Sequence, residues 1–269
     1  MPIHRYTIRN VPVDEVQVSD LVEQAVLLSG RRDRSRYICY LNAHVYNLAR
    51  SDPRLHAVLE QATICYADGA SVVWAANRLG GRLSGRLTAA DFFPRVMHAL
   101  GEQQRRLFVL GGRPGVADRA ARAMIRDAAG CQLVGSHHGY FDVQRESPQV
   151  LAQIRAARPD VLIVGMGTPK QELWIAEHLA ALQVPLVWAV GALLDYHAGE
   201  EKRCPTWMGD HGLEWLYRLL LNPRRHAVRY LWGNPRFVWS VLTAAKPDPL
   251  RARVHAEPHA DASAREGPS

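Results

Sequence analysis

The chain has 269 residues, 48% of them hydrophobic and 22% charged, and a formal net charge of +7. These values are typical of a soluble globular protein with one large domain, or one domain and an appendage. No stretch approaches the roughly 18 uninterrupted apolar residues of a membrane-spanning helix, and the first residues show no apolar core of a secretory signal. The four cysteines lie far apart and form no CxxC pair, which argues against structural zinc and for a reducing compartment.

From residue 36 onward, strand-like and helix-like segments alternate. Short apolar strands that alternate with longer helices predict a mainly parallel sheet with helices on both faces. We therefore predict a Rossmann-like α/β domain over residues 1–202. The predicted strands are 36–42, 62–68, 105–112, 131–141, 160–167 and 184–192, and the helices between them include 43–51, 69–80, 114–130 and 170–182.

The chain changes character after the last of these strands. Residues 212–242 show no such alternation and predict two or three short helices, separated at Asn222-Pro223 and Asn234-Pro235. Residues 246–269 are rich in proline, alanine and charge without apolar periodicity, which predicts a disordered tail. The segment between the α/β domain and this tail, residues 203–245, is interpreted as a helical appendage.

This appendage holds most of the net positive charge. From Leu213 through Lys246, the first residue after the appendage, there are six basic residues and one acidic residue, Glu214. Arginines beside aromatic rings favour the membrane interface, because rings lie at headgroup depth while arginines meet anionic phosphates. We therefore predict docking on an anionic membrane surface and no nucleic-acid partner, since the rest of the chain lacks a basic stripe. The interleaved aromatic residues are Trp215, Tyr217, Tyr230, Trp232, Phe237 and Trp239.

Two polar side chains come directly at the ends of predicted strands. Asn42 ends the strand at 36–42, and Asp68 ends the strand at 62–68. Asparagine and aspartate commonly cap the helix that follows, and this structural role explains both residues. The carboxyl edge of a parallel sheet is also where ligands bind, so Asp68 could instead act as a general base.

The stretch GRLTAADFF contains Arg86, Thr88 and Asp91. Thr88 with an acid three residues later fits the capping box that opens a helix. Arg86 lies just outside that helix and has no structural role there, so it could meet an anion.

The stretch GMGTPKQE, residues 165–172, is longer than a connection between a strand and a helix needs. It places Gln171 and its polar neighbours at the ligand-binding edge of the sheet. A tight turn followed by a solvated first helical turn would explain the same residues. The spacing GxGxxG is missing, so the glycines do not favour a dinucleotide site.

Metal-binding patterns are absent from the sequence. No two aspartates have the Asp-x-Asp spacing with which many nucleotide-sugar transferases hold a divalent ion against a diphosphate. His137 and His138, with Asp142 nearby, lack metal-ligand spacing on a fixed element. We therefore predict no metal and no other cofactor. A bound nucleotide diphosphate would be held by arginines and helix N-termini.

Six stretches that span roughly residues 36–242 carry a resemblance: YLNAHVYNLARSDP, ATICYADGASVVWA, GRLTAADFF, DVLIVGMGTPKQELW, VGALLDYHAGEEKRCPTWM and GLEWLYRLLLNPRRHAVRYLWGNPRF. In order and spacing they resemble the WecG/TagA/CpsF glycosyltransferases. The resemblance implies inverting, metal-independent transfer from a UDP-sugar to an undecaprenyl-diphosphate-linked acceptor in cell-surface polysaccharide synthesis. The implied donor is of the N-acetylmannosamine type or a related hexose or uronic acid, and the implied location is peripheral, on the cytoplasmic face of the cell membrane.

The resemblance also implies roles for residues of the α/β domain. Asp68 corresponds to the family's proposed base, and Asn42 to the asparagine of its NAxxxxLA stretch. Arg86 corresponds to the arginine before TxxD, and Thr88 to the threonine of that motif, so both are expected to bind substrate. Gln171 corresponds to the glutamine of PxQE, which the turn is expected to expose at the nucleotide-sugar site while Glu172 supports the loop.

In the appendage, the family's arginines that close over the diphosphate correspond to Arg218 and Arg225. A third falls at Val228, so Arg229 is a candidate substitute. Tyr40 stands where relatives often have threonine, and a hydroxyl contact from that position does not carry over directly.

Other functions stay open on the sequence alone. Within the enzyme class, the donor could be UDP-glucose in exopolysaccharide assembly. Outside it, the chain could be a non-catalytic module whose basic appendage binds a membrane, and release of UDP would separate these classes. The sequence does not decide between a monomer and a homo-oligomer.

Overall fold

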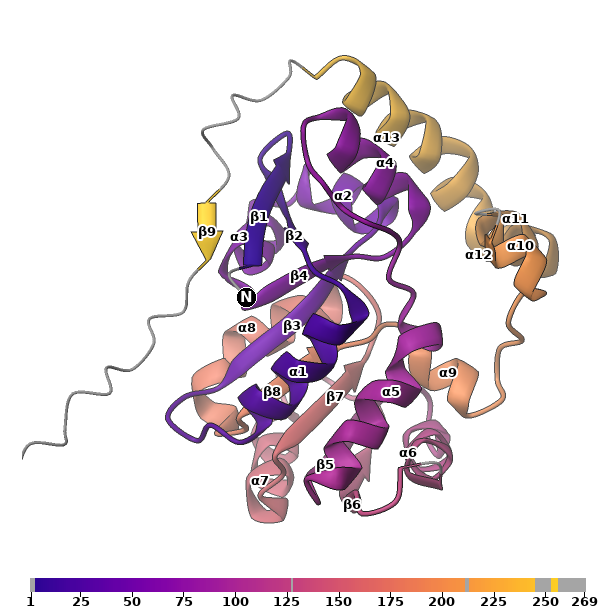
Figure 1. The fold of residues 1–269 in the computed structure, drawn as a ribbon. Coiled ribbons are helices and arrows are strands. Elements are labelled where there is room, and N and C mark those ends of the chain that lie inside the picture. Colours follow the sequence, from indigo (N-terminus) through magenta and orange to yellow (C-terminus); the bar gives the residue numbers. More distant parts are fainter. Residues whose placement is uncertain (1–2, 127, 211–212, 245–252, 256–269) are drawn as a thin grey trace, which may run out of the picture.

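The computed structural model describes residues 3–126, 128–210, 213–244 and 253–255 (Figure 1). They form a nine-stranded sheet of order β6-β5-β7-β8-β3-β4-β2-β1-β9. Neighbours from β6 to β2 are parallel, whereas β1 is antiparallel to β2 and to β9. The predicted mainly parallel α/β sheet is therefore confirmed. The strands are β1 (Ile3–Ile8), β2 (Val11–Glu15), β3 (Arg36–Leu41), β4 (Ile64–Ala67), β5 (Arg106–Gly111), β6 (Gln132–His137), β7 (Val161–Gly165), β8 (Leu186–Ala189) and β9 (Arg253–His255).

Helices cover both faces of the sheet (Figure 1). On one face α1 contacts α5 and α5 contacts α6, and on the other α3 lies between α2 and α8, with α7 beyond α8. The described helices are α1 (Val18–Ser29), α2 (Ala43–Ala49), α3 (Pro53–Gln61), α4 (Ala70–Arg78), α5 (Ala89–Glu102), α6 (Val116–Arg126), α7 (Ser147–Ala157), α8 (Lys170–Leu182), α9 (Leu193–His197), α10 (Thr206–Asp210), α11 (Glu214–Leu221), α12 (Pro223–Ala227), the π-helix η1 (Val228–Trp232) and α13 (Gly233–Leu242).

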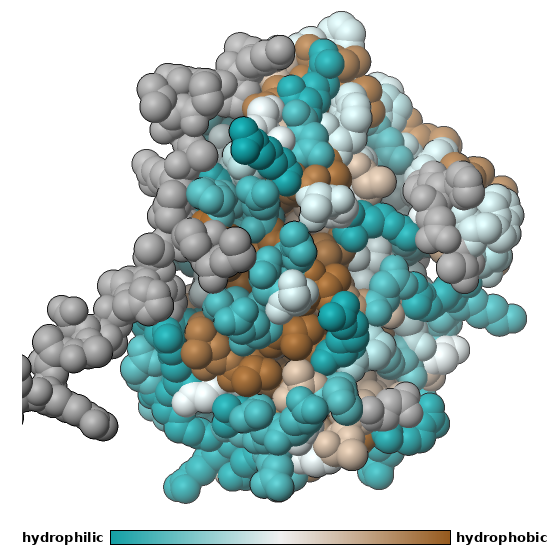
Figure 2. Space-filling view, in the orientation of Figure 1, coloured by the Kyte–Doolittle hydropathy of each residue, from teal (hydrophilic) through white to brown (hydrophobic). Residues whose placement is uncertain are grey.

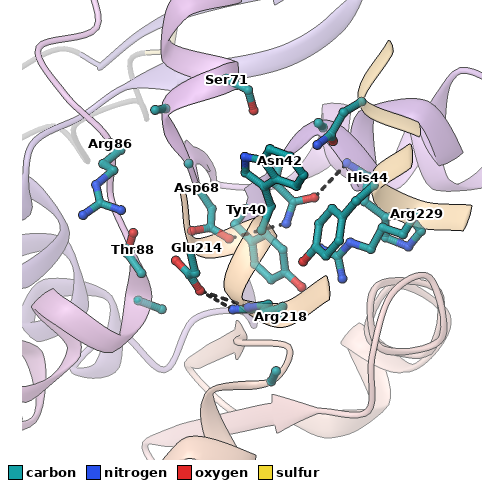
Figure 3. A pocket seen from close by; sticks show the side chains of 18 of the residues that line it. Tyr40, Asn42, His44, Asp68, Ser71, Arg86, Thr88, Glu214, Arg218 and Arg229 are labelled. Carbon is teal, nitrogen blue, oxygen red and sulfur yellow. Dashed lines mark hydrogen bonds and ion pairs between the residues drawn. The ribbon is translucent and has the colours of Figure 1, made fainter. Parts of the chain in front are cut away.

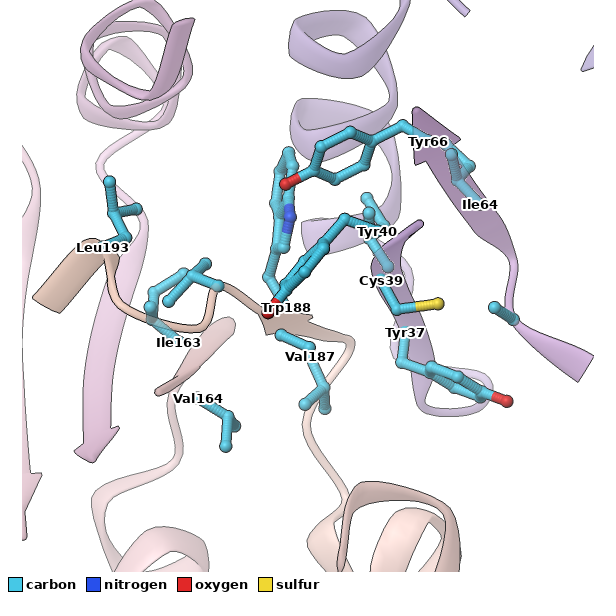
Figure 4. Close-up of a cluster of buried hydrophobic side chains, with 14 of the residues drawn as sticks. Tyr37, Cys39, Tyr40, Ile64, Tyr66, Ile163, Val164, Val187, Trp188 and Leu193 are labelled. Carbon is cyan, nitrogen blue, oxygen red and sulfur yellow. The ribbon is translucent and has the colours of Figure 1, made fainter. Parts of the chain in front are cut away.

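The central strands β3, β4, β7 and β8 are buried along their whole length. Helices on both faces explain this, and they explain why these strands are continuous apolar runs in the sequence. At the centre, the Trp188 ring meets Tyr66 and Phe93 edge to face, with centroids 6.4 and 5.5 Å apart. Figure 4 shows Trp188 and Tyr66 beside Tyr40, so the same aromatic cluster supports the strand ends that carry the site.

The N-terminal hairpin of β1 and β2 is missing from the predicted elements. Its two strands are linked by a buried ion pair in which Arg5 Nε of β1 donates to Asp14 Oδ1 of β2 at 2.7 Å. Arg5 also donates to the carbonyl oxygens of Glu60 and Ala62, and Asp14 accepts the Cys65 N–H. Full pairing of both charges is what makes their burial tolerable. Charged residues at buried strand positions also hide the apolar pattern by which a strand is recognised.

The appendage is helical, and one of the two predicted breaks between its helices is not found. Asn222-Pro223 separates α11 from α12, because Pro223 begins α12 at a position that needs no N–H donor. Asn234-Pro235 instead lies in the first turn of α13, where proline is also tolerated. The chain therefore continues from α12 through η1 into α13 without the expected break.

The last helix of the appendage packs on the α/β domain. The Tyr46 hydroxyl of α2 lies 2.7 Å from Ser240 Oγ of α13, and its ring meets Phe237 edge to face at 5.0 Å. Phe237 and Val241 are each 1% exposed and belong to the main hydrophobic core. The core thus extends into the segment that the sequence separates as an appendage.

The outer face of the appendage carries exposed apolar side chains. The exposed fraction is 74% for Trp232 and 70% for Trp239. Figure 2 shows brown, hydrophobic side chains along this edge of the molecule, over α13. The other large apolar side chains exposed here are Trp207, Leu220, Leu221, Val228, Leu231, Val238 and Leu242. No helix in the described part of the chain is both long enough and apolar enough to cross a membrane.

Most of the tail that is predicted to be disordered, residues 246–252 and 256–269, lies outside the described residues. Its residues 253–255 form the short strand β9, which pairs with β1 at the edge of the sheet.

Candidate active site

A cavity of about 370 Å³ opens at the carboxyl ends of β3, β4 and β8 (Figure 3). The opposite wall comes from the segment that precedes α5 and from α11, η1 and α13 of the appendage. The α/β domain and the appendage therefore enclose it together, at the sheet edge where open α/β folds bind ligands. Its polar lining residues are Tyr40, Asn42, His44, Asp68, Ser71, Arg86, Thr88, Tyr196, Glu214, Arg218, Arg229, Tyr230 and Asn234.

Asp68 follows β4 and faces this cavity instead of capping α4. The capping position belongs to Gly69, whose φ of +105° favours glycine, and no side chain caps the helix. Asn42 Nδ2 donates to Asp68 Oδ2 at 3.4 Å. The simple capping interpretation of Asp68 is therefore wrong, and its carboxylate is available to a ligand.

The environment of Asp68 favours its protonated form. Burial is the main cause that raises its pKa to about 6, and the nearby charge of Glu214 adds to the increase. Arg218, the Asn42 hydrogen bond and Arg229 oppose it. A carboxylate with this pKa is largely ionised at neutral pH and still basic enough to take a proton from a hydroxyl.

Asn42 combines capping with a role in the site. Its Oδ1 accepts the N–H groups of His44 and Val45, at 3.1 and 3.0 Å, and so caps α2. Its amide group then points to Asp68, which makes it an orienting residue for the carboxylate. Burial, followed by the charge of Arg229, lowers the pKa of His44 to about 4, so this cavity residue is neutral at pH 7.

Three arginines from separate segments line the cavity: Arg86, Arg218 and Arg229. Arg218 Nε donates to Glu214 Oε1 at 3.1 Å, and its guanidinium carbon lies 5.4 Å from the centroid of the Tyr196 ring. The positive charges of the three arginines converge on one cavity, and such an arrangement is suited to binding phosphate groups.

The structure places Arg229 in the cavity and leaves Val228 78% exposed. Both residues begin η1, whose wide turns change the phase of the helix. Arg229, the candidate substitute for the family's third arginine, therefore lines the cavity, whereas Val228 does not. Arg225 belongs to α12, but its side chain lies outside what the structure describes.

Thr88 lines the cavity, and the predicted capping box at this position is wrong. Thr88 is the capping residue of α5, yet its side chain makes no capping hydrogen bond. Asp91 forms an ion pair with Arg203 instead of reaching back to the start of the helix. The hydroxyl of Thr88 is therefore placed for a ligand, beside Arg86 on the same segment.

Gln171 is not exposed at the site, so that expectation is wrong. Its side chain is 0% exposed and is absent from the cavity lining. Gln171 Nε2 donates to Glu172 Oε1 at 2.7 Å, and its Oε1 accepts the Gly191 N–H at 3.2 Å. Glu172 is also buried, at 1% exposed, and accepts the Thr168 hydroxyl at 2.8 Å.

Several lining residues escape the sequence analysis, notably Tyr196 and Glu214. Glu214 has a detectable signal, because it lies four residues before Arg218 on a helix and such pairs contact each other. Tyr196 has no comparable signal in the sequence apart from its position after a predicted strand. In the described part of the chain, no group of three or more His, Cys, Asp or Glu side chains is arranged to hold a metal ion.

A carboxylate that is largely ionised at neutral pH lies with three arginines in a cavity at the edge of a parallel sheet, a combination that suits group transfer from an anionic leaving group. The model of the family described as "Glycosyl transferase WecG/TagA/CpsF family" matches residues 6–249. The chain therefore belongs to this family of glycosyltransferases, which confirms the resemblance seen in the motifs.

Curated relatives match over most of their length. A protein of Bacillus spizizenii is 29% identical over 228 residues, which cover 85% of this chain and 84% of that protein. A protein of Staphylococcus aureus is 28% identical over 240 residues, covering 89% of this chain and 92% of that protein. Both relatives are named N-acetylglucosaminyldiphosphoundecaprenol N-acetyl-beta-D-mannosaminyltransferase.

Proposed function

We propose that this enzyme transfers a sugar from a UDP-sugar to a sugar linked to polyprenyl diphosphate, with inversion at the anomeric carbon. The observation that carries the proposal is Asp68, a base with a raised pKa that faces a cavity lined by three arginines. The names of the relatives supply the acceptor class, a diphosphoundecaprenol-linked sugar.

The chemistry needs a base and a site for the leaving diphosphate. Asp68 accepts the proton of the acceptor hydroxyl, whose oxygen forms the new bond to the anomeric carbon. The bond from that carbon to the UDP oxygen breaks on the opposite side, so a single displacement inverts the configuration. A well-placed general base contributes roughly 10²–10⁴-fold to such a reaction.

Arginines replace a metal ion in this proposal. Negative charge grows on the departing UDP, and the guanidinium groups of Arg86, Arg218 and Arg229 surround the cavity in which it forms. Arg225 is one turn from Arg229 along the chain and is proposed to join them. With Asp68 as the base and arginines that stabilise the leaving UDP, the proposed reaction inverts the anomeric carbon without a metal ion and without a covalent intermediate.

The appendage is proposed to bring the cavity to a lipid-linked acceptor. Its exposed tryptophans and leucines adjoin the same helices that supply Arg218 and Arg229. Apolar burial together with basic charge favours an anionic membrane surface. The enzyme is accordingly proposed to act as a peripheral protein on the cytoplasmic face of the cell membrane, in synthesis of a cell-surface polysaccharide.

The names of the relatives favour an N-acetylmannosamine donor, and UDP-glucose is the alternative. A direct test measures UDP release by the full chain with a panel of UDP-sugars and a short-chain lipid-diphosphate acceptor. We expect release that requires both substrates and is fastest with one N-acetylhexosamine donor. A chain that floats with anionic liposomes but releases no UDP from any donor would be a membrane-binding module and would refute the enzymatic proposal.

A further inference from the structure

Tyr40 occupies a boundary between the cavity and a buried polar cluster. It is the next-to-last residue of β3, pairs with Tyr66 of β4, lines the cavity and is 9% exposed. Figure 3 shows it at the centre of the view, with Asp68 and Arg229 on opposite sides. Its hydroxyl points away from these charges, toward the connection between β7 and α8, where it lies 3.2 Å from Thr168 Oγ1.

The cluster behind Tyr40 has a defined direction of hydrogen bonding. Thr168 gives its hydroxyl proton to Glu172 Oε1 at 2.8 Å, so its oxygen accepts the proton of Tyr40. Gln171 Nε2 donates to Glu172 Oε1 at 2.7 Å and to the Tyr40 oxygen at 3.4 Å. Glu172 is thus the final acceptor for two side chains that hold the Tyr40 hydroxyl.

The same cluster fixes a second wall of the cavity. Gln171 Oε1 accepts the Gly191 N–H at 3.2 Å, and Gly191 adjoins the lining residues Val190 and Ala192. A methyl group added at Gly191 would lie 2.4 Å from the Tyr40 hydroxyl oxygen. Close approach at this point requires glycine, which also suits the φ of +58°. The Tyr40 hydroxyl is therefore held by the hydrogen bonds of Thr168 and Gln171 and by the close approach of Gly191.

Glu172 has no obvious reason to be buried for stability alone. It forms no ion pair with any described residue, and its Oε2 has no hydrogen-bond partner there. Burial raises its pKa, as expected for a carboxyl group without a cation. Burying a carboxyl group with an unpaired oxygen costs free energy of folding. The side chains that Glu172 holds in place therefore indicate why it is retained.

We propose that Tyr40 is a specificity-determining residue that limits the size of the sugar accepted by the cavity, and that Glu172 is the positioning residue that keeps Tyr40 there. This inference rests on the proposed function of the cavity. The ring of Tyr40 closes the floor, and the space behind it contains Thr168, Gln171 and Glu172. Removing the ring deepens the cavity into that polar cluster, which then offers hydrogen bonds to a bulkier substituent.

The test compares UDP-hexoses with UDP-N-acetylhexosamines, using the full chain and a short-chain acceptor. In Tyr40→Ser the ratio of kcat/KM for the bulkier over the smaller donors should rise about tenfold or more, because a pocket discriminates by roughly that factor per small group. Tyr40→Phe keeps the ring but loses the hydroxyl through which Glu172 holds it, so the ratio should shift about as far as in a variant that lacks Glu172, and less than in Tyr40→Ser.

Glu172 is tested through the same ratio, which a purely structural role would not move. Glu172→Ala removes the acceptor for Thr168 and Gln171, so it should shift the ratio in the direction of Tyr40→Ser. Glu172→Gln should restore the wild-type ratio, because a side-chain amide oxygen can accept both hydrogen bonds. Circular dichroism and thermal unfolding identify any variant that fails to fold, and the ratio is read from the variants that do.

Two results would overturn the inference while leaving the enzymatic proposal intact. One is an unchanged ratio in a folded Tyr40→Ser variant that still releases UDP. The other is a shift in Tyr40→Phe as large as in Tyr40→Ser, which would assign the effect to the hydroxyl instead of the ring. Failure of the wild-type chain to release UDP from any donor would instead refute the proposed function.

Discussion

Replacing Asp68 with asparagine should make the protein more stable and much less active. Burial raises the pKa of Asp68 from 3.8 to about 6, so the native state binds its proton more tightly than the unfolded state. Stability contributed by this group is therefore lost as pH rises from about 4 to above 6. The two pKa values give a cost of about 1.6 kcal/mol at pH 5 and about 3 kcal/mol at pH 8, which water in the open cavity reduces.

The Asp68→Asn variant removes this charge while keeping the size of the side chain. Urea unfolding should show a higher midpoint than wild type at pH 8 and a smaller gain at pH 5. Turnover, measured as UDP release, should fall roughly 10²-fold or more because the base is lost. In the wild type, the rate should fall as pH decreases through about 6, since only the ionised carboxylate accepts a proton.

Asp52→Asn provides the matched control. Asp52 caps α3, and a hydrogen bond from Arg54 lowers its pKa, so losing its charge should bring no gain in stability at pH 8. Turnover should be unchanged. An Asp68→Asn protein with the same pH dependence of stability as wild type would contradict the burial argument, and near-normal turnover would remove Asp68 as the base.

Three further predictions concern the leaving group and the appendage. Arg229→Ala should raise the KM for the donor about tenfold or more. Arg224→Ala, on an exposed part of α12, should change this KM by no more than about twofold. Equal effects of the two substitutions would contradict a role for Arg229 in donor binding. Chelation with EDTA should leave the rate of UDP release unchanged, and a loss that manganese or magnesium restores would contradict charge stabilisation by arginines. Trp232→Ala with Trp239→Ala should weaken flotation with anionic liposomes yet spare turnover on a short-chain acceptor, while Tyr140→Ala, an exposed aromatic outside the appendage, should leave flotation unchanged.

The sheet and the edge that carries the site follow from local patterns in the sequence. Apolar runs that alternate with helices predict the six strands β3 to β8, and Asn42 and Asp68 mark the carboxyl ends of two of them. The hairpin of β1 and β2 does not follow, because its buried Arg5 and Asp14 are tolerable only through partners near residues 60–65. A local pattern contains no information on such remote pairing.

The direction of individual side chains is harder to predict than the location of the site. Gln171 lies at the expected edge, but hydrogen bonds to Glu172 and Gly191 turn it inward. Thr88 has a capping sequence, yet Asp91 pairs with Arg203 from a distant segment. Arg229, in contrast, lines the cavity as the sequence analysis allowed, within a π-helical turn that it did not predict.

Mass analysis of the lipid-linked acceptor after incubation with the full chain and a UDP-sugar tests the proposed transfer most directly. The account predicts that the acceptor gains the mass of one sugar residue, that one UDP is released for each product formed, and that Asp68→Asn lowers both rates together. UDP release without any gain in acceptor mass, or an equal rate of product formation by Asp68→Asn, would contradict it.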